Sequence, residues 1–324
     1  MFALRLCVLI AAVAAPALAA PAHAQADYPS RPVRLILPNA PGSSIDTVGR
    51  ALAAHLSTTL GQSVFAENRA GAAGLLGMEA GRTAAADGYT FIVASSSSMT
   101  AAPLMKKAVP FDVLKDFDFV SPVALLPNVL AVNPALGVGS VREFVAWARA
   151  NPGRVNMASA GVGSVSHLAG VNFGVAAGFD ALHVPHTGGA QSVASVVSGQ
   201  THWTLTPAPA AMGLVKAGRL KALGHSMGRD ARVLEGMPSL AETVPGFAFN
   251  GWIGIVAPRG VPAAALDKLR TALAAAMRVP ALEATLAANG AIPHLSSPAE
   301  FRAFLVRDIE ETRRTMKAAA IEPE

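Results

Sequence analysis

The sequence predicts an α/β protein made of two units, each with parallel strands and helices between them. Apolar runs typical of buried strands alternate with amphipathic runs typical of helices, and this alternation indicates parallel strands with right-handed crossovers. Two strand-to-helix turns consist of small residues, Pro41-Gly42-Ser43-Ser44-Ile45-Asp46 and Ser159-Ala160-Gly161-Val162-Gly163-Ser164. The length of 324 residues suits two domains of ordinary size.

In the first unit, the apolar run 33–37 indicates a buried strand that leads into the first Gly/Ser turn. Ser43 fits the N-cap of the next helix with Asp46 at N3, and Gly61 should end that helix after Leu60. Strands over 63–67 and 89–94, with a short helix to about residue 84 between them, continue the alternation. The serines at 95–98 open another helix.

The alternation resumes after Pro127. We expect strands over 128–132, 155–158, 182–185, 203–205 and 220–223, and helices over 141–150, 164–177, 189–198 and 208–216. Beyond Pro245-Gly246 follow a strand over 250–257, a helix to about residue 278, and a last helix capped by Ser297 with Pro298 at N1. Ligands of open α/β sheets bind at the carboxyl ends of strands, where both Gly/Ser turns lie.

Residues 1–24 have the pattern of a secretory signal peptide. Arg5 precedes an apolar stretch over 6–20, and Ala22-His23-Ala24 is a small-x-small cleavage site. We therefore expect cleavage after Ala24, a mature chain that begins at Gln25, and a periplasmic protein. No later segment offers about 18 unbroken apolar residues, so we expect the mature protein to be soluble.

Cysteine and charge exclude several classes of function. The single cysteine, Cys7, lies in the leader, so the mature chain has no disulfide, thiolate metal site or cysteine nucleophile. Without Arg5 the chain keeps 25 basic and 21 acidic residues, a net charge of +4. No basic run is interleaved with aromatic residues, so we expect no nucleic-acid surface. The mild positive charge is compatible with an anionic ligand.

The two Gly/Ser turns together indicate a two-sided clamp for a small anion. Small residues let backbone N–H groups approach a ligand, and the helix that follows adds unpaired donors and the positive end of its dipole. Each turn also has a plainer interpretation: Ser43 and Asp46 as a capping pair, and Gly161-Val162-Gly163 as a connector. Asp46 cannot donate to a carboxylate, so a direct role would need an amine, amide or water on the ligand.

Two catalytic or metal interpretations are weaker. Gly224-His225-Ser226-Met227-Gly228 fits a nucleophile elbow, and Asp267 and His294 follow in the order of an α/β-hydrolase. However, Pro238 would soon break the helix that this elbow requires, and no His-Gly-Gly oxyanion motif precedes it. The histidines His167, His183, His186 and His202 could suggest a metal site, but carboxylates nearby are few, and His183 and His186 flank Pro185 on an extended segment and cannot share a helix face. We therefore expect no enzyme activity, no catalytic residue, no metal and no cofactor.

Short motifs spread over almost the whole mature chain resemble those of one family. They are Tyr28-Pro29-Ser30-Arg31-Pro32-Val33, Pro41-Gly42 with Asp46, Glu67-Asn68-Arg69 with Gly71 and Gly74, Asp87-Gly88-Tyr89-Thr90, Asn151-Pro152-Gly153, Ser159-Ala160-Gly161 with Gly163-Ser164 and His167-Leu168, Gly199-Gln200, Ala217-Gly218-Arg219-Leu220, and Ala257-Pro258. The chain resembles the Bug family, the extracytoplasmic solute receptors of tripartite tricarboxylate transporters. It departs at Ser43-Ser44, where a second glycine is usual, and at His186, where a tyrosine is common.

The resemblance implies a type II periplasmic-binding-protein fold: two α/β lobes around a cleft, with two crossover strands as hinge and no catalysis. The lobes would be 25–127 with 249–324, and 128–248. It implies a monomer that holds a small carboxylate, or a related amide or aromatic acid, and delivers it to transporter membrane subunits. A ligand sensor acting on a membrane signalling protein would share this binding chemistry. The implied ligand contacts are Gly42, Ser43, Ser44, Asp46, Ser97, Ser159, Gly161, Gly163, Ser164, His167, His186, Thr187 and Gly188.

Overall fold

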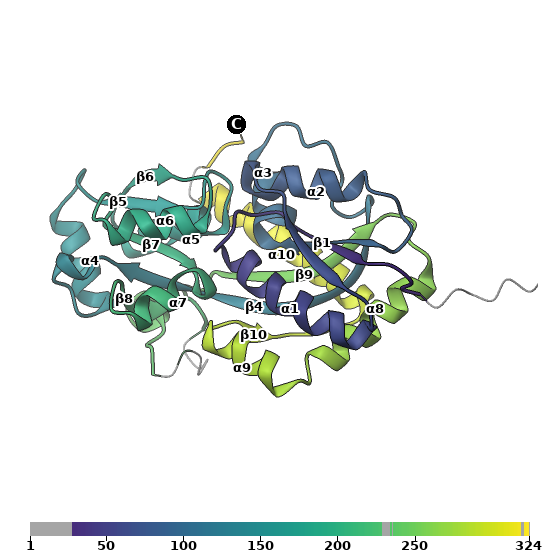
Figure 1. The fold of residues 1–324 in the computed structure, drawn as a ribbon. Helices are drawn as coiled ribbons and strands as arrows, with labels where there is room; N and C mark the ends of the chain where they lie inside the picture. The colour runs from purple at the N-terminus through teal and green to yellow at the C-terminus, as the bar shows by residue number, and fades with distance from the viewer. Residues whose placement is uncertain (1–27, 229–233, 235, 319–320, 324) are drawn as a thin grey trace, which may run out of the picture.

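The computed structural model shows two α/β lobes side by side, joined by a pair of strands (Figure 1). It describes residues 28–228, 234, 236–318 and 321–323. The expected signal peptide and its cleavage site lie outside the described residues. No described helix is long and apolar enough to span a membrane.

The strands run through both lobes in the order β2-β1-β3-β9-β4-β7-β5-β6, with β8 and β10 paired to β4 as well. Neighbours are parallel within β2-β1-β3 and β7-β5-β6, as the alternation predicts, but β9 and β4 are antiparallel to their neighbours. The strands are β1 (Val33–Leu37), β2 (Val64–Asn68), β3 (Thr90–Ser95), β4 (Phe117–Val132), β5 (Asn156–Ser159), β6 (Leu182–Pro185), β7 (Trp203–Pro207), β8 (Lys221–His225), β9 (Asn250–Pro258) and β10 (Ile292–Pro293).

Helices cover both faces of the sheet in each lobe. Those of the first lobe are α1 (Ser44–Leu60), α2 (Leu75–Arg82), the π-helical turn η2 (Ser97–Ala101), α3 (Ala102–Met105), α8 (Ala263–Ala276), α9 (Pro280–Ala288) and α10 (Pro298–Ala318). Those of the second are α4 (Val141–Ala150), α5 (Val165–Ala177), α6 (Gly189–Val197) and α7 (Ala208–Lys216). Short 3₁₀ turns are η1 (Ala72–Gly74), η3 (Pro134–Leu136) and η4 (Leu240–Glu242).

Each lobe has its own buried core on either side of the sheet. In the first lobe, α1, α8 and α9 bury one face, and α2, α10 and the η2–α3 segment bury the other. In the second lobe, α4 and α5 pack around Trp203 on one face, and α6 and α7 cover the opposite face. Each lobe therefore has a core of its own, and a smaller buried cluster of Ala101, Met105, Leu168 and Met316 joins the two lobes.

The strand β4 differs from the expectation. The sequence predicts a strand over 128–132, but these are only the last five residues of a 16-residue strand that begins at Phe117. The preceding part pairs with β9 as far as Pro127, and the last five residues pair with β7 and β8. Pro122 lies at a shift of register, where the missing N–H is tolerated.

Candidate functional site

A small cavity of about 40 Å³ lies between the two lobes, at the carboxyl ends of several strands. It has room for only a few water molecules. Residues of the first lobe that line it are Asn39, Ser43, Ser44, Ile45, Ser95, Ser96, Ser97, Leu126, Gly251 and Trp252. Residues of the second lobe are Ala160, Ser164, Val165, Ser166, Gly189, Thr206 and Pro207.

Four helices begin at this cavity. The first residues of α1, α5 and α6 line it, and so does Pro207, the N-cap of α7. The amides of Ser44, Ile45, Ser166 and Gly189 have no hydrogen-bond partner among the described residues. Unpaired N–H groups and positive dipole ends therefore converge on one space from both lobes, which favours an anion there.

The start of α1 is built by the capping pair that the sequence predicts. The Ser43 hydroxyl accepts a hydrogen bond from the Asp46 amide at 3.2 Å, and Gly61 ends the helix in the left-handed conformation. The two oxygens of Asp46 accept bonds from the Gly42 amide at 2.9 Å and from the Arg50 guanidinium at 2.8 Å. Asp46 thus braces the turn from within the first lobe and does not line the cavity.

The turn over 159–164 is held by side chains of its own lobe. The Ser159 hydroxyl lies 2.6 Å from His183 Nε2 and accepts a bond from the Gly161 amide at 3.1 Å. The Ala160 amide donates to the Ser166 hydroxyl at 3.0 Å, and Ser164 caps α5. The glycines at 161 and 163 have positive φ angles of 115° and 77°, which only glycine adopts readily.

The lobes touch beside the cavity. The Val165 amide of the second lobe donates to the Ser97 hydroxyl of the first at 2.9 Å. A Cβ placed on Gly163 would lie 3.1 Å from the Ala102 Cα of the opposite lobe, and one on Gly42 would lie 3.4 Å from the Ala190 Cβ. The structure is therefore a closed arrangement of the two lobes.

Three histidines lie behind the second turn. The rings of His167 and His183 stack with their centroids 4.0 Å apart, and His167 Nδ1 accepts a bond from the Gly163 amide. Burial, with the charge of His183, lowers the pKa of His167 to about 4. Burial also lowers the pKa values of His183 and His186. These rings are therefore neutral at pH 7, and no described group of three or more His, Cys, Asp or Glu could hold a metal ion.

The cavity includes some, not all, of the residues expected to contact a ligand. Ser43, Ser44, Ser97 and Ser164 line it. The others lie around it without lining it: Gly42, Asp46, Ser159, Gly161, Gly163, His167, His186, Thr187 and Gly188. Thr187 is exposed and bonds to Gln191, and His186 Nε2 is buried without a partner among the described residues.

Sequence reasoning missed the contribution of the strands that cross between the lobes. Leu126, Gly251 and Trp252 line the cavity from β4 and β9, and Thr206 and Pro207 line it from the end of β7. These residues carry no local motif. Among the described residues that line the cavity none is charged, so a bound anion would meet amides and hydroxyls rather than a basic side chain.

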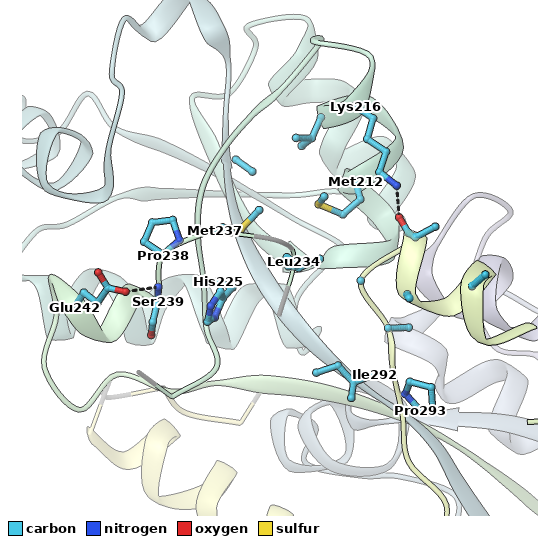
Figure 2. Close-up of a pocket in the computed structure, with 18 residues that line it drawn as sticks. Met212, Lys216, His225, Leu234, Met237, Pro238, Ser239, Glu242, Ile292 and Pro293 are labelled. Atoms are coloured by element: carbon cyan, nitrogen blue, oxygen red, sulfur yellow. Dashed lines mark hydrogen bonds between the residues drawn. The ribbon is translucent and has the colours of Figure 1, made fainter. Parts of the chain in front are cut away.

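A second cavity of about 1520 Å³ lies elsewhere between the lobes (Figure 2). Its walls are α7, β8, Leu234 and residues of the segment 236–242 of the second lobe, with α9 and β10 of the first. The Lys216 ammonium on its edge donates to the Ala288 carbonyl at 2.6 Å, and the Glu242 carboxylate accepts a bond from the Ser239 amide (Figure 2). Neither predicted turn reaches it, so the smaller cavity is the candidate site.

Ser226, the candidate nucleophile, is buried and bonds to both β4 and β9, the strands that connect the lobes. Its hydroxyl donates to the Asn250 side-chain oxygen at 2.8 Å and accepts a bond from the Asn128 amide at 2.8 Å. No hydrogen bond joins it to a histidine within the described part of the chain. Asp267 on α8 pairs with Arg270 instead.

The sequence matches a family model described as the tripartite tricarboxylate transporter family receptor over residues 48–321. Among curated proteins, it is similar to Protein BugT of Bordetella pertussis, with 33% identity over 300 residues that cover 92% of each chain. BugT supports the resemblance to the Bug family that the motifs indicate.

Two solved structures of Rhodopseudomonas palustris proteins share the fold. The structure of Rpa4515 with adipate superposes with a TM-score of 0.89 at 30% identity, covering 92% of this chain and 100% of that chain. The structure of MatC with bound malate superposes with a TM-score of 0.82 at 27% identity, covering 89% of this chain and 99% of that chain. These likenesses confirm the expected two-lobed α/β fold.

Proposed function

The chain belongs to the tripartite tricarboxylate transporter receptor family, and on this basis we propose that it captures a small carboxylate between its lobes and delivers it to the membrane subunits of such a transporter. The observation that carries the proposal is the meeting of four helix N-termini around one cavity without a charged side chain. Adipate and malate, which the related proteins hold, are both short aliphatic dicarboxylates, and this is the ligand class we propose first.

Neutral donors are sufficient for useful affinity. One helix N-terminus contributes about 0.3–1 kcal/mol to anion binding, and about 2 kcal/mol at best. Micromolar affinity requires about 8 kcal/mol, so dipoles alone fall short. The remainder would come from charge-assisted hydrogen bonds to the free amides of Ser44, Ile45, Ser166 and Gly189, strengthened because closure excludes water. The hydroxyls of Ser44 and Thr206, which bond to none of the described residues, would add to these donors.

Closure of the two lobes would let the membrane subunits distinguish the ligand-bound protein from the free protein. The lobes touch beside the cavity, so entry and release of a ligand require them to separate. A ligand that touches both lobes favours the closed state only by its higher affinity for that state. The membrane subunits would recognise the closed shape.

The remaining parts of the proposal concern the whole protein. We take the lobes as residues 25–127 with 249–324 and 128–248, supported by the change in the partners of β4 between Pro127 and Asn128. We propose that the mature chain acts in the periplasm as a monomer, after removal of residues 1–24. Nine predicted contacts lie outside the cavity lining, and we assign them to shaping the two turns and the lobe interface.

A thermal-shift screen tests the carboxylate proposal. The panel is acetate, succinate, malate, adipate, citrate, glutamate and benzoate, with adipamide as the neutral counterpart of adipate. We expect a saturable rise in Tm with at least one acid, corresponding to about 2.7 kcal/mol at a concentration of 100 times Kd. Adipamide should have no effect. A panel in which no acid stabilises the protein, or in which the amide equals the acid, contradicts the proposal.

A paired substitution tests the cavity. Ser44→Ala combined with Thr206→Val removes one free hydroxyl from the cavity lining of each lobe, and it should raise the Kd of the best acid about tenfold. Thr271→Val on α8, an exposed residue outside the lining, is the control and should leave Kd unchanged. Equal affinities for the paired variant and the control would place the ligand elsewhere.

A further inference from the structure

Asp308 on α10 connects two elements that form the wall of the cavity. Its Oδ2 accepts a hydrogen bond from the Thr100 hydroxyl at 2.6 Å and another from the Trp252 indole Nε1 at 2.8 Å. Thr100 belongs to η2 and Trp252 to β9. Burial raises the pKa of Asp308, and Glu311 adds to this, while the two hydrogen bonds act in the opposite direction.

Both partners of Asp308 lead directly to the lobe interface. Trp252 lines the cavity, and its backbone amide donates to the Ser96 hydroxyl at 3.3 Å. Thr100 lies in the same π-helical turn as Ser97, whose hydroxyl accepts the Val165 amide of the opposite lobe. The Oδ2 atom of Asp308 is therefore linked, through Thr100 and the η2 turn, to the Ser97–Val165 hydrogen bond that joins the lobes.

The packing of the Trp252 ring and its hydrogen bond to Asp308 have different effects. The Trp252 indole is 1% exposed and meets Phe301 and Phe304 of α10 edge-on, at centroid distances of 5.4 and 5.8 Å. Packing of this kind fills the space, whereas the bond to Asp308 fixes the direction of the N–H and hence the orientation of the indole ring. A π-helical turn lacks the regular hydrogen bonds of an α-helix, so a side-chain anchor at Thr100 fixes its shape.

We propose that Asp308 is a positioning residue for the ligand cavity: it does not touch the ligand, but it holds Trp252 and the η2 turn in the arrangement in which Ser97 meets the second lobe. We call the two hydrogen bonds that Asp308 accepts from Thr100 and Trp252 the Asp308 brace. The brace depends on these bonds alone, whereas its effect on ligand affinity rests on the proposed function.

The first experiment needs no ligand. The indole Nε1–H resonance of Trp252 is followed by NMR and assigned among the three tryptophans with Trp252→Phe. In the wild type we expect it to move with pH as Asp308 ionises. In Asp308→Ala it should be displaced and lose this titration. Glu310→Gln, which removes a charge from an exposed position of the same helix, should leave it unchanged. An indole resonance that is the same in Asp308→Ala and the wild type overturns the brace.

The second experiment measures adipate and malate binding by calorimetry. We expect Asp308→Ala to raise Kd at least about tenfold, because two buried donors lose their acceptor. Asp308→Asn keeps one oxygen that can accept both bonds and should stay within about threefold of the wild type. Wild-type affinity in Asp308→Ala overturns the role in binding. If the wild type binds neither acid, the proposed function fails for these ligands, and the indole resonance alone decides the brace.

Discussion

The Ser97 hydroxyl of the first lobe accepts a hydrogen bond of 2.9 Å from the Val165 amide of the second. Both residues line the cavity and each lies at the start of a helix, so closure itself satisfies an amide that α5 would otherwise leave unpaired. The bond exists only while the lobes are together, and it therefore contributes to the closed state alone.

Ser97→Ala should weaken ligand binding by shifting the lobes toward the open arrangement. One neutral hydrogen bond is worth about 0.5–1.5 kcal/mol, so we expect Kd of the best carboxylate to rise up to about tenfold. Calorimetry gives Kd, and Ser98→Ala is the matched control, because that hydroxyl bonds only to Ser95 in the same turn. An unchanged Kd in Ser97→Ala would show that this contact does not contribute to closure.

Gly163→Ala should impair closure while both lobes remain folded. The added Cβ would lie 3.1 Å from the Ala102 Cα of the opposite lobe, and the φ of 77° strains any residue other than glycine. Gly137→Ala carries the same strain at a φ of 76° with nothing within 4 Å. We expect similar losses of Tm in both variants but a Kd at least about tenfold higher only in Gly163→Ala. Equal Kd values in the two variants would contradict this mechanism.

Acid should destabilise the second lobe through its histidines. Burial lowers the pKa of His167 to about 4, against 6.5 in the unfolded chain. Below pH 6.5 the unfolded state therefore binds more protons than the folded state. The contribution of His167 to the free energy of unfolding is full above that pH and is lost as pH falls toward 4. The lowering of the His167 pKa from 6.5 to about 4 corresponds to about 3 kcal/mol in the free energy of unfolding. We expect urea unfolding between pH 6.5 and 4.5 to show a flatter pH dependence in His167→Gln, with His55→Gln of α1 as the control. The same pH dependence of the free energy of unfolding in the wild type and in His167→Gln would contradict this prediction.

Ser226→Ala distinguishes a structural role from catalysis. The variant leaves the Asn128 amide without its acceptor at a buried position, so the free energy of unfolding should fall by about 1–3 kcal/mol. Hydrolysis of p-nitrophenyl acetate should be at the background rate in both proteins. Enzymatic turnover in the wild type that this substitution abolishes would restore the hydrolase interpretation.

Much of the fold could be predicted because local signals agree with it. Ser43 and Gly61 bound α1 as their cap preferences require, and the ranges 182–185 and 208–216 match β6 and α7. The helix α9 was missed because Pro280 resembles the end of α8 rather than a new first turn. Residues 117–127 of β4 were missed because Pro122 and Pro127 are typical of breaks, and only pairing with β9 makes that segment a strand.

The site was less predictable than the fold. Ser43, Ser44, Ser97 and Ser164 belong to turns with a recognisable local pattern, and these residues line the cavity. Trp252, near the start of β9, and Thr206, near the end of β7, reach it from the two strands that flank β4, and this order of strands is not visible in any sequence spacing. His167 and Ser159 stay predicted ligand contacts; in the structure each also bonds to a neighbour in its own lobe.

The pairing of β4 with β9 determines which motions the receptor can make. The two strands pass between the lobes as one antiparallel ribbon, with Leu126 opposite Gly251 and Pro127 opposite Asn250. Sliding one lobe past the other would break this ladder, whereas bending and twisting the ribbon keep its hydrogen bonds. A ribbon of this kind favours opening by rotation of one lobe relative to the other, so ligands of different length would be accommodated by different degrees of closure rather than by rebuilt walls.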